Sequence, residues 1–170
     1  PKKIMEKIDV VFKEMINTLD NSDGDKLKDI QPLICFLFGI PSEDVRLKST
    51  GKELQSHIHM ALFEMLCLIT KHSNTSTVPM VIILEDLHWI DGPSLEALQF
   101  IMQGFTDIKS KKDMGNLFIL NFRPNFTMPD SIAKDVHYEF FPLEPLSDDN
   151  STALIEETFE SDAIPGYEIK

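Results

Sequence analysis

Apolar side chains recur every three or four residues through much of the first 72 positions, which is the spacing of one face of an α-helix. Residues 4–19 therefore predict an amphipathic helix. Its apolar face is formed by Ile4, Ile8, Val11, Phe12, Met15 and Leu19. Residues 21–25 are polar and include Gly24, and they predict a turn. Residues 52–71 return to the helical rhythm and predict another helix.

A further helix is predicted between the helices at 4–19 and 52–71, again from apolar residues at helical spacing. They are Ile30, Leu33, Ile34, Leu37 and Phe38. Pro32 is expected in the first turn of this helix, where a residue without an N–H donor is tolerated. Gly39 and Pro41 are expected to end it.

The pattern changes beyond residue 79. Residues 80–84 and 117–120 are uninterrupted apolar runs, typical of strands that a parallel sheet covers on both faces. Between the two runs, residues 91–93 (Asp-Gly-Pro) are expected to start a helix. Its buried side would carry Leu95, Leu98, Met102 and Phe105. A short third strand is predicted at 137–141, and Ser147 is expected to cap a final helix that runs through Phe159.

Strand, helix and strand in this order, with both strands buried, form a βαβ unit, so the predicted fold class is α/β with a parallel sheet. The length of 170 residues suits one domain. We expect a mainly helical segment at 1–75, a βαβ core at 76–145 and the start of a further helical part at 146–170. A chain that begins at Pro1 and stops soon after a helical pattern is expected to be an excerpt of a longer protein.

Charge and composition narrow the class of partner. The formal net charge is -12, which argues against nucleic acid or an anionic membrane surface as the main partner. No apolar run is long enough to cross a bilayer. Cys35 and Cys67 form no Cys-x-x-Cys pair and are expected to be buried, reduced thiols in a cytoplasmic protein.

Two adjacent carboxylates, Glu85 and Asp86, follow the first apolar run directly. Open α/β sheets bind ligands at the carboxyl ends of their strands. One carboxylate there can hold a water of a hydrated Mg²⁺, and the other can orient an attacking water. Taken alone, the same two acids could equally end a strand and cap a turn, and the pair by itself does not separate these readings.

The longer string around the two acids resembles the STAND-type, AAA-like P-loop ATPase domains found in large regulatory proteins, including proteins with class III nucleotide cyclase domains. Their Walker B strand ends in a D/E-D-L-H-W-x-D string, which Glu85–Asp91 matches throughout. Four shorter segments are similar to the family in the family's order, over roughly residues 30–160. They are Leu37–Pro41, Asp91–Leu98, Leu120–Phe126 and Phe141–Ser147.

This resemblance implies a partial P-loop fold, a three-layer αβα sandwich, with ATP and Mg²⁺ as ligands. It places Glu85 at a water of the magnesium ion and Asp86 at the hydrolytic water. Asn121 would act as a sensor near the γ-phosphate, and Arg123 as a nearby responsive charge. His88 and Trp89 are expected to fix the turn and pack against the neighbouring helix.

Two departures from the family pattern bear on activity. Many P-loop ATPases have Asp then Glu where this chain has Glu85 then Asp86, which is expected to make hydrolysis slow. The sequence has no G-x-x-x-x-G-K-[ST] loop: Gly51-Lys52-Glu53 lacks the Ser or Thr and has Arg46 at the position of the first glycine. Either the loop lies upstream in the parent protein, or the domain has lost it.

The resulting expectation is an ATP-binding regulatory module that acts on a neighbouring output domain, with a cyclase as one candidate. ATPase activity is expected only if the parent protein carries the loop, and oligomerisation is left open. A degenerate interaction scaffold is the alternative, and an unrelated metal-using α/β enzyme is a third reading. His57, His59, Cys67 and His72 lack metal-ligand spacing and are expected to be solvated or packed. The open sheet edge is expected to leave the excerpt poorly stable alone.

Overall fold

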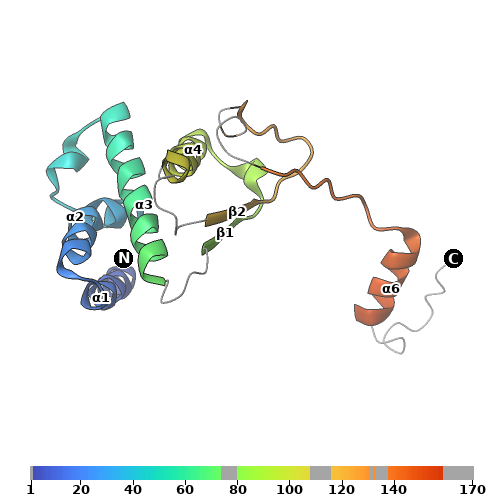
Figure 1. Ribbon diagram of the computed structural model, residues 1–170, viewed down its shortest axis with the longest axis horizontal. Helices are drawn as coiled ribbons and strands as arrows, with labels where there is room; N and C mark the ends of the chain where they lie inside the picture. The colour runs from blue at the N-terminus through green and yellow to red at the C-terminus, as the bar shows by residue number, and fades with distance from the viewer. Residues whose placement is uncertain (1, 74–79, 108–115, 131, 133–137, 159–170) are drawn as a thin grey trace. The chain divides into compact units, whose positions relative to one another are not determined.

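The computed structural model describes residues 2–73, 80–107, 116–130, 132 and 138–158. The described part is mostly helical and contains a small parallel sheet of two strands, so the architecture mixes helices with a sheet as predicted (Figure 1). Contacts divide the chain into two compact units, Pro1–His137 and Tyr138–Lys170, which are treated separately below. No helix in the described ranges combines the length and apolar composition that a membrane span requires.

Three helices form the first part of the larger unit: α1 (Lys2–Thr18), α2 (Asn21–Leu37) and α3 (Lys52–Ser73). Consecutive helices contact each other, and the short 3₁₀ helix η1 (Val45–Lys48) packs against α3 (Figure 1). Their predicted apolar faces meet in one core. Its buried members are Phe12, Leu27, Ile30, Leu33, Ile34, Ala61 and Leu68. The helical segment predicted from periodicity is therefore confirmed.

The predicted turn at 21–25 is wrong, because α2 already begins at Asn21. The Asp20 carboxylate accepts a hydrogen bond from the backbone N–H of Asp23 at 2.8 Å, which is a helix N-cap. Pro32 consequently lies in the helix interior rather than in its first turn. Burial of the α2 face, including Leu27 upstream of the predicted start, outweighs the hydrogen bond that Pro32 removes.

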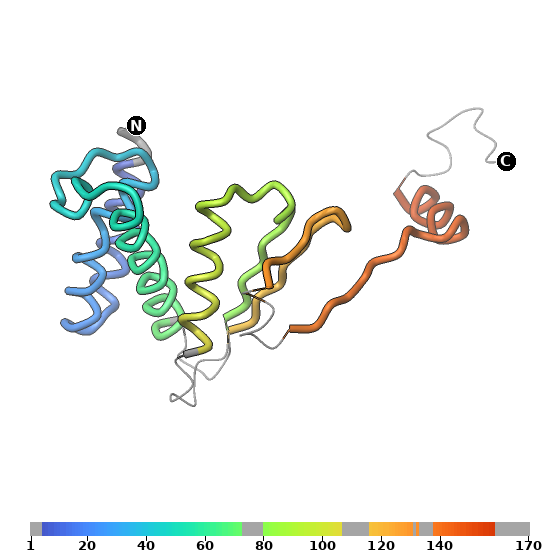
Figure 2. Tube along the Cα trace, turned by 90° about the horizontal axis from the view of Figure 1, so that it is seen from above, coloured from blue at the N-terminus to red at the C-terminus, as the bar shows by residue number. Residues whose placement is uncertain are grey.

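The βαβ unit follows. Strand β1 (Met80–Leu84) pairs in parallel with β2 (Asn116–Leu120), with Met80 opposite Asn116 and Leu84 opposite Leu120. Helix α4 (Gly92–Asp107) connects them and lies between α3 and the paired strands (Figure 2). A second core joins α4 to one face of the sheet. Its buried members are Leu87, Leu98, Met102 and Ile132, with Leu84, Phe118 and Leu120 packed against them.

The described residues leave the opposite face of the sheet open. Val81, Ile83, Leu117 and Ile119 are 49%, 58%, 52% and 44% exposed. The expectation that both strands are buried on both faces is therefore wrong for the described residues. The apolar composition of residues 80–84 and 117–120 shows that both faces of these strands can be buried. Helix α4 packs against only one of the two faces.

Helices α3 and α4 approach each other closely at a glycine. An added Cβ at Gly104 would lie 2.6 Å from a ring carbon of Phe63. The Phe63 ring makes edge contacts with Phe100 at 6.2 Å and Phe105 at 5.2 Å between ring centroids. Gly104 therefore provides the space in which this aromatic cluster packs.

The smaller unit contains helix α6 (Asp148–Thr158), which Ser147 caps as predicted: its Oγ accepts from the Asn150 N–H at 3.3 Å. The prediction of a third strand at 137–141 is wrong for residues 138–141, which form neither helix nor strand. Pro142 and Pro145 follow directly, and proline cannot donate to a sheet ladder. His137 and Phe159 lie outside the described residues.

Candidate functional site at the carboxyl end of the sheet

The acidic pair lies at the carboxyl end of β1, as the sequence predicts. Glu85 and Asp86 are both exposed, whereas the next residue, Leu87, is buried in the core beneath α4. Asp86 has φ 55° and ψ 36°, the left-handed region. In the described part of the chain it is the only residue other than glycine with a positive φ. This conformation costs roughly 1 kcal/mol and turns the chain sharply between an exposed and a buried position.

Asn121 holds this turn from the neighbouring strand. Its backbone N–H donates to the Leu84 carbonyl at 2.9 Å, and its own carbonyl accepts from the Leu87 N–H, also at 2.9 Å. One residue thus bonds the chain on both sides of Glu85 and Asp86, so the two acids protrude beside Asn121. The structure brings these three predicted site residues together.

Arg123 lies two residues beyond Asn121 and is exposed. Its carbonyl accepts from the Phe126 N–H at 3.0 Å, which closes a turn after β2. In the described ranges its guanidinium forms no ion pair with either acid of the turn. Arg123 therefore shares the carboxyl edge of the sheet with the acids without being joined to them.

A short 3₁₀ helix, η2 (Leu87–Trp89), continues the turn. The Trp89 N–H donates to the Asp86 carbonyl at 2.9 Å, and the Ile90 N–H donates to the Leu87 carbonyl at 3.1 Å. The expectation that Trp89 packs against the neighbouring helix is wrong, because this side chain is 78% exposed. Leu87 anchors the turn instead. Both ring nitrogens of His88 are enclosed and have no hydrogen-bond partner among the described residues.

Asp91 starts α4, as predicted. Its Oδ1 accepts from the backbone N–H of Ser94 at 2.8 Å. This hydrogen bond lowers the pKa of the Asp91 carboxyl below its ordinary value, because it favours the charged form. The acid pair is thus followed, five residues after Asp86, by the capped start of α4, where Asp91 carries a third negative charge.

The donor set at this edge suits a hydrated magnesium ion that a nucleotide also holds. Mg²⁺ takes one or two protein carboxylates and keeps several waters. Glu85 and Asp86 are solvent-accessible carboxylates in this position. Nowhere in the described ranges do three or more His, Cys, Asp or Glu side chains gather into a site for a metal ion. Two adjacent, exposed carboxylates are within the number of protein ligands that a hydrated Mg²⁺ takes.

Two of the histidines that could have suggested a metal site, His59 and His72, have packing or hydrogen-bonding partners. His59 packs against Phe100 with 5.7 Å between ring centroids, and burial lowers its pKa. Cys35 is buried as expected, whereas Cys67 is only half-buried. Burial raises the pKa of the Cys35 thiol, which makes it less reactive at neutral pH.

Asp23 is only 2% exposed, and its ion pairs with more exposed side chains were not predicted from the sequence. Its carboxylate pairs with Lys71, with His72 Nε2 at 2.7 Å and with Lys26 at 3.4 Å. The hydrogen bond from Lys71 is the main cause that lowers its pKa to about 2. An Asp three residues after another Asp, at the start of a helix, was the available signal for its position.

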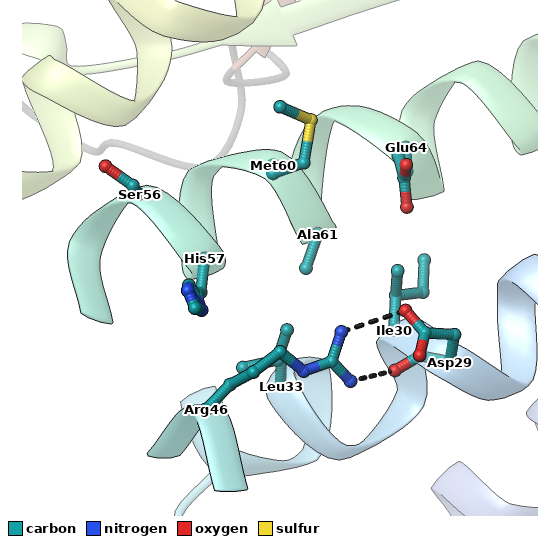
Figure 3. A pocket seen from close by; sticks show the side chains of 9 residues that line it. All are labelled: Asp29, Ile30, Leu33, Arg46, Ser56, His57, Met60, Ala61 and Glu64. Carbon is teal, nitrogen blue, oxygen red and sulfur yellow. Dashed lines mark hydrogen bonds and ion pairs between the residues drawn. The ribbon is translucent and has the colours of Figure 1, made fainter. Parts of the chain in front are cut away.

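A separate surface cavity of about 370 Å³ lies between α2, η1 and α3 (Figure 3). Arg46 extends across it and pairs with Asp29 at 2.8 Å (Figure 3). Its guanidinium also pairs with Asp44 at 2.7 Å. Ile30, Leu33 and Ala61 form its apolar floor. None of the predicted site residues lines this cavity.

The chain was also compared with known proteins. A scan of the sequence against protein-family models, a search of curated proteins and a search of solved structures each find no match. The features that bear on function are therefore the carboxyl end of β1 and the string Glu85–Asp91.

Proposed function

We propose that this chain is the Walker B and sensor portion of a regulatory ATP-binding module of the STAND type, within a larger signalling protein. One observation carries the proposal: the parallel pairing of β1 and β2 puts Glu85 and Asp86 beside Asn121, through two backbone hydrogen bonds of 2.9 Å. Adjacent carboxylates next to a polar strand end are what a magnesium–nucleotide complex requires at this edge of an α/β sheet.

The residues divide the work by position. Glu85 would hold a water of the magnesium ion, and Asp86 would orient the water nearest the γ-phosphate. Asn121 follows the next strand and senses the γ-phosphate, with Arg123 as the nearby positive charge. Magnesium bound with ATP supplies charge neutralisation of the phosphates. The chain itself contributes the orientation of the acid pair. Asn121 supports this orientation because it donates a backbone hydrogen bond to Leu84 and accepts one from Leu87, on the two sides of the pair.

Slow turnover suits a switch. The Glu85 arm is one methylene longer than the aspartate found at this position in many P-loop ATPases, and the Asp86 arm is one methylene shorter than glutamate. We infer that ATP occupancy, more than hydrolysis, sets the conformation that a neighbouring output domain reads. A nucleotide cyclase is the output domain that the resemblance favours.

The metal-binding part of this proposal can be tested on the chain itself with Mn²⁺, a paramagnetic substitute for Mg²⁺. In ¹⁵N-labelled protein, substoichiometric Mn²⁺ is expected to broaden the amide signals of residues 84–88 and Asn121 first. Glu85→Gln/Asp86→Asn should abolish this local broadening, because it removes both charges and keeps the shape of the side chains. The exposed acids of the smaller unit provide the control, Glu139→Gln/Glu144→Gln, which should leave it intact. Equal broadening at all acidic positions would contradict the assignment.

A non-catalytic interaction scaffold is the second candidate, and the uncovered face of the sheet favours it. Val81, Ile83, Leu117 and Ile119 form an apolar surface suited to protein contact. The sequence also lacks a phosphate-binding loop. If the full-length protein binds no magnesium–ATP but loses a protein partner when this face is made polar, the scaffold is the correct description.

A further inference from the structure

Trp89 is the only tryptophan of the chain, and 78% of its side chain is exposed. The backbone of the turn that carries Trp89 is held in place by several contacts. The Trp89 N–H donates to the Asp86 carbonyl at 2.9 Å, the buried Leu87 anchors the same turn, and the His88 ring lies against the indole with 5.3 Å between centroids. An exposed indole costs free energy in water, and tryptophan is enriched among the residues that dominate protein interfaces.

The surroundings of this indole are negatively charged. Asp86 precedes it by three residues and Asp91 follows it by two, and both are exposed. The sequence contains no Lys or Arg from residue 72 to residue 108. The charge of Asp91 is secure at neutral pH, because its hydrogen bond with Ser94 lowers its pKa.

An exposed indole with a carboxylate three residues before it and another two residues after it in the chain attracts a planar cation. A guanidinium can stack on the indole and pair with a carboxylate at the same time, whereas an ammonium is a compact, strongly hydrated charge that gains less from stacking. An acidic peptide or a nucleic-acid backbone would be repelled from the same surface.

We propose that Trp89, Asp86 and Asp91 form a docking surface for an arginine side chain in a basic segment of a partner protein. Charge complementarity identifies the partner's chemistry, and the fixed turn supplies the rigid aromatic anchor. The test of this proposal does not require ATP, because Trp89 and Asp91 have no role in the proposed nucleotide site. Asp86 belongs to both sites, and the variants used below leave it unchanged.

The test uses the fluorescence of Trp89 in the whole chain, without magnesium or nucleotide. The probes are a peptide with alternating glycine and arginine and its counterpart in which neutral citrulline replaces each arginine. The arginine peptide is expected to change the fluorescence saturably, with binding that weakens as salt rises. The citrulline peptide should have no effect, since it keeps the planar shape and lacks the charge.

Variants assign the effect to this surface. Asp91→Asn retains a capping oxygen for Ser94 and removes one charge, and it should weaken binding by about two- to fivefold. Asp148→Asn is the matched control, because Asp148 is an exposed acid in the first turn of another helix, α6. Trp89→Leu, followed by calorimetry, should weaken binding by about two- to fivefold.

Three results would overturn the proposal: an equal response to the citrulline peptide, equal weakening by Asp91→Asn and Asp148→Asn, or unchanged affinity in Trp89→Leu. Equal weakening would mean attraction to the net charge of the chain alone. Loss of magnesium–ATP binding in the full-length protein would leave these peptide results unaffected, so this test and the test of the nucleotide site fail independently.

Discussion

At the scale of single residues, Asp86 combines a candidate catalytic side chain with the left-handed backbone at φ 55°. The sequence was enough to predict that Glu85 and Asp86 follow a strand and that Asn121 follows its neighbour. The backbone of Asp86 was not predictable, because the family string specifies residue types and carries no information on φ. The hydrogen bonds of Asn121 also escape prediction, since they are made by main-chain atoms that every residue has.

The Asp86 turn leads to a prediction about backbone strain. Asp86→Gly should leave the free energy of unfolding unchanged or raise it slightly, because glycine adopts this conformation freely. Asp86→Val should lower it by about 1–2 kcal/mol, since a β-branched side chain is strained there. Urea unfolding measures both. Glu85→Val is the control, because Glu85 is equally exposed but has no positive φ. Equal losses in the two valine variants would contradict a strained Asp86.

The buried carboxylate of Asp23 should make stability depend on acid. Its pKa is lowered from 3.8 to about 2 in the folded state, so its contribution is present above pH 4 and lost as pH falls through about 2. A shift of this size corresponds to roughly 2 kcal/mol. Asp23→Asn should therefore destabilise the protein at pH 6, and the difference from wild type should shrink toward pH 2.

Urea unfolding at a series of pH values checks this prediction. Asp25→Asn serves as the control on the same helix, because the Asp25 side chain is 75% exposed and pairs only with the exposed Lys28. A difference between wild type and Asp23→Asn that stays constant from pH 6 to pH 2 would show that the charge of Asp23 is not the stabilising feature.

At the scale of elements, periodicity predicted the helices, the two strands and their parallel pairing, because each depends on one face that must be buried. It failed at 21–25. There the Asp20 carboxylate accepts a hydrogen bond from the Asp23 N–H, and the α2 face packs against the core, so the helix extends through polar residues. It also failed at 138–141, where aromatic residues with high strand propensity form no strand. A strand forms only when a second segment pairs with it, whereas strand propensity describes one segment alone.

The close approach of α3 and α4 predicts an unusual response to a common substitution. Glycine to alanine inside a helix normally stabilises by roughly 0.5–1 kcal/mol. Gly104→Ala should instead destabilise by about 1–3 kcal/mol, because the new methyl group meets the Phe63 ring at 2.6 Å. Phe63→Leu in the same protein should relieve this clash. A double-mutant cycle by urea unfolding would contradict the packing if the two effects were simply additive.

The uncovered sheet face predicts self-association of the isolated chain. Val81→Thr/Leu117→Thr changes two residues that are opposite each other in the register and about half-exposed. This pair should reduce association in sedimentation velocity while changing the free energy of unfolding by less than about 1 kcal/mol. The control, Ile82→Thr/Phe118→Thr, alters the face beneath α4 and should lose several kcal/mol. Unchanged association in the first pair would mean that this face is not the adhesive surface.

At the scale of the whole molecule, the chain joins a helical segment to a βαβ unit and has a separate acidic unit at 138–158. The mixture of helices with a parallel sheet was predictable because it follows from the order of apolar segments. The open face of the sheet could not be predicted from the strand sequences. Their apolar composition shows that both faces can be buried, but it does not show whether another segment covers each face. The expectation that the isolated chain is poorly stable remains a prediction, and a broad, weakly cooperative thermal transition would agree with it.

Magnesium–ATP binding to the full-length protein, measured by calorimetry, tests the central claim most directly. Wild type is compared with Glu85→Ala/Asp86→Ala, and with Glu139→Ala/Glu144→Ala as a control for net charge. An ATP-dependent switch predicts binding in wild type and in the control, with binding or turnover lost or altered in the first variant. Absence of binding in all three proteins would contradict it, and would leave a retained fold whose ligand is another protein.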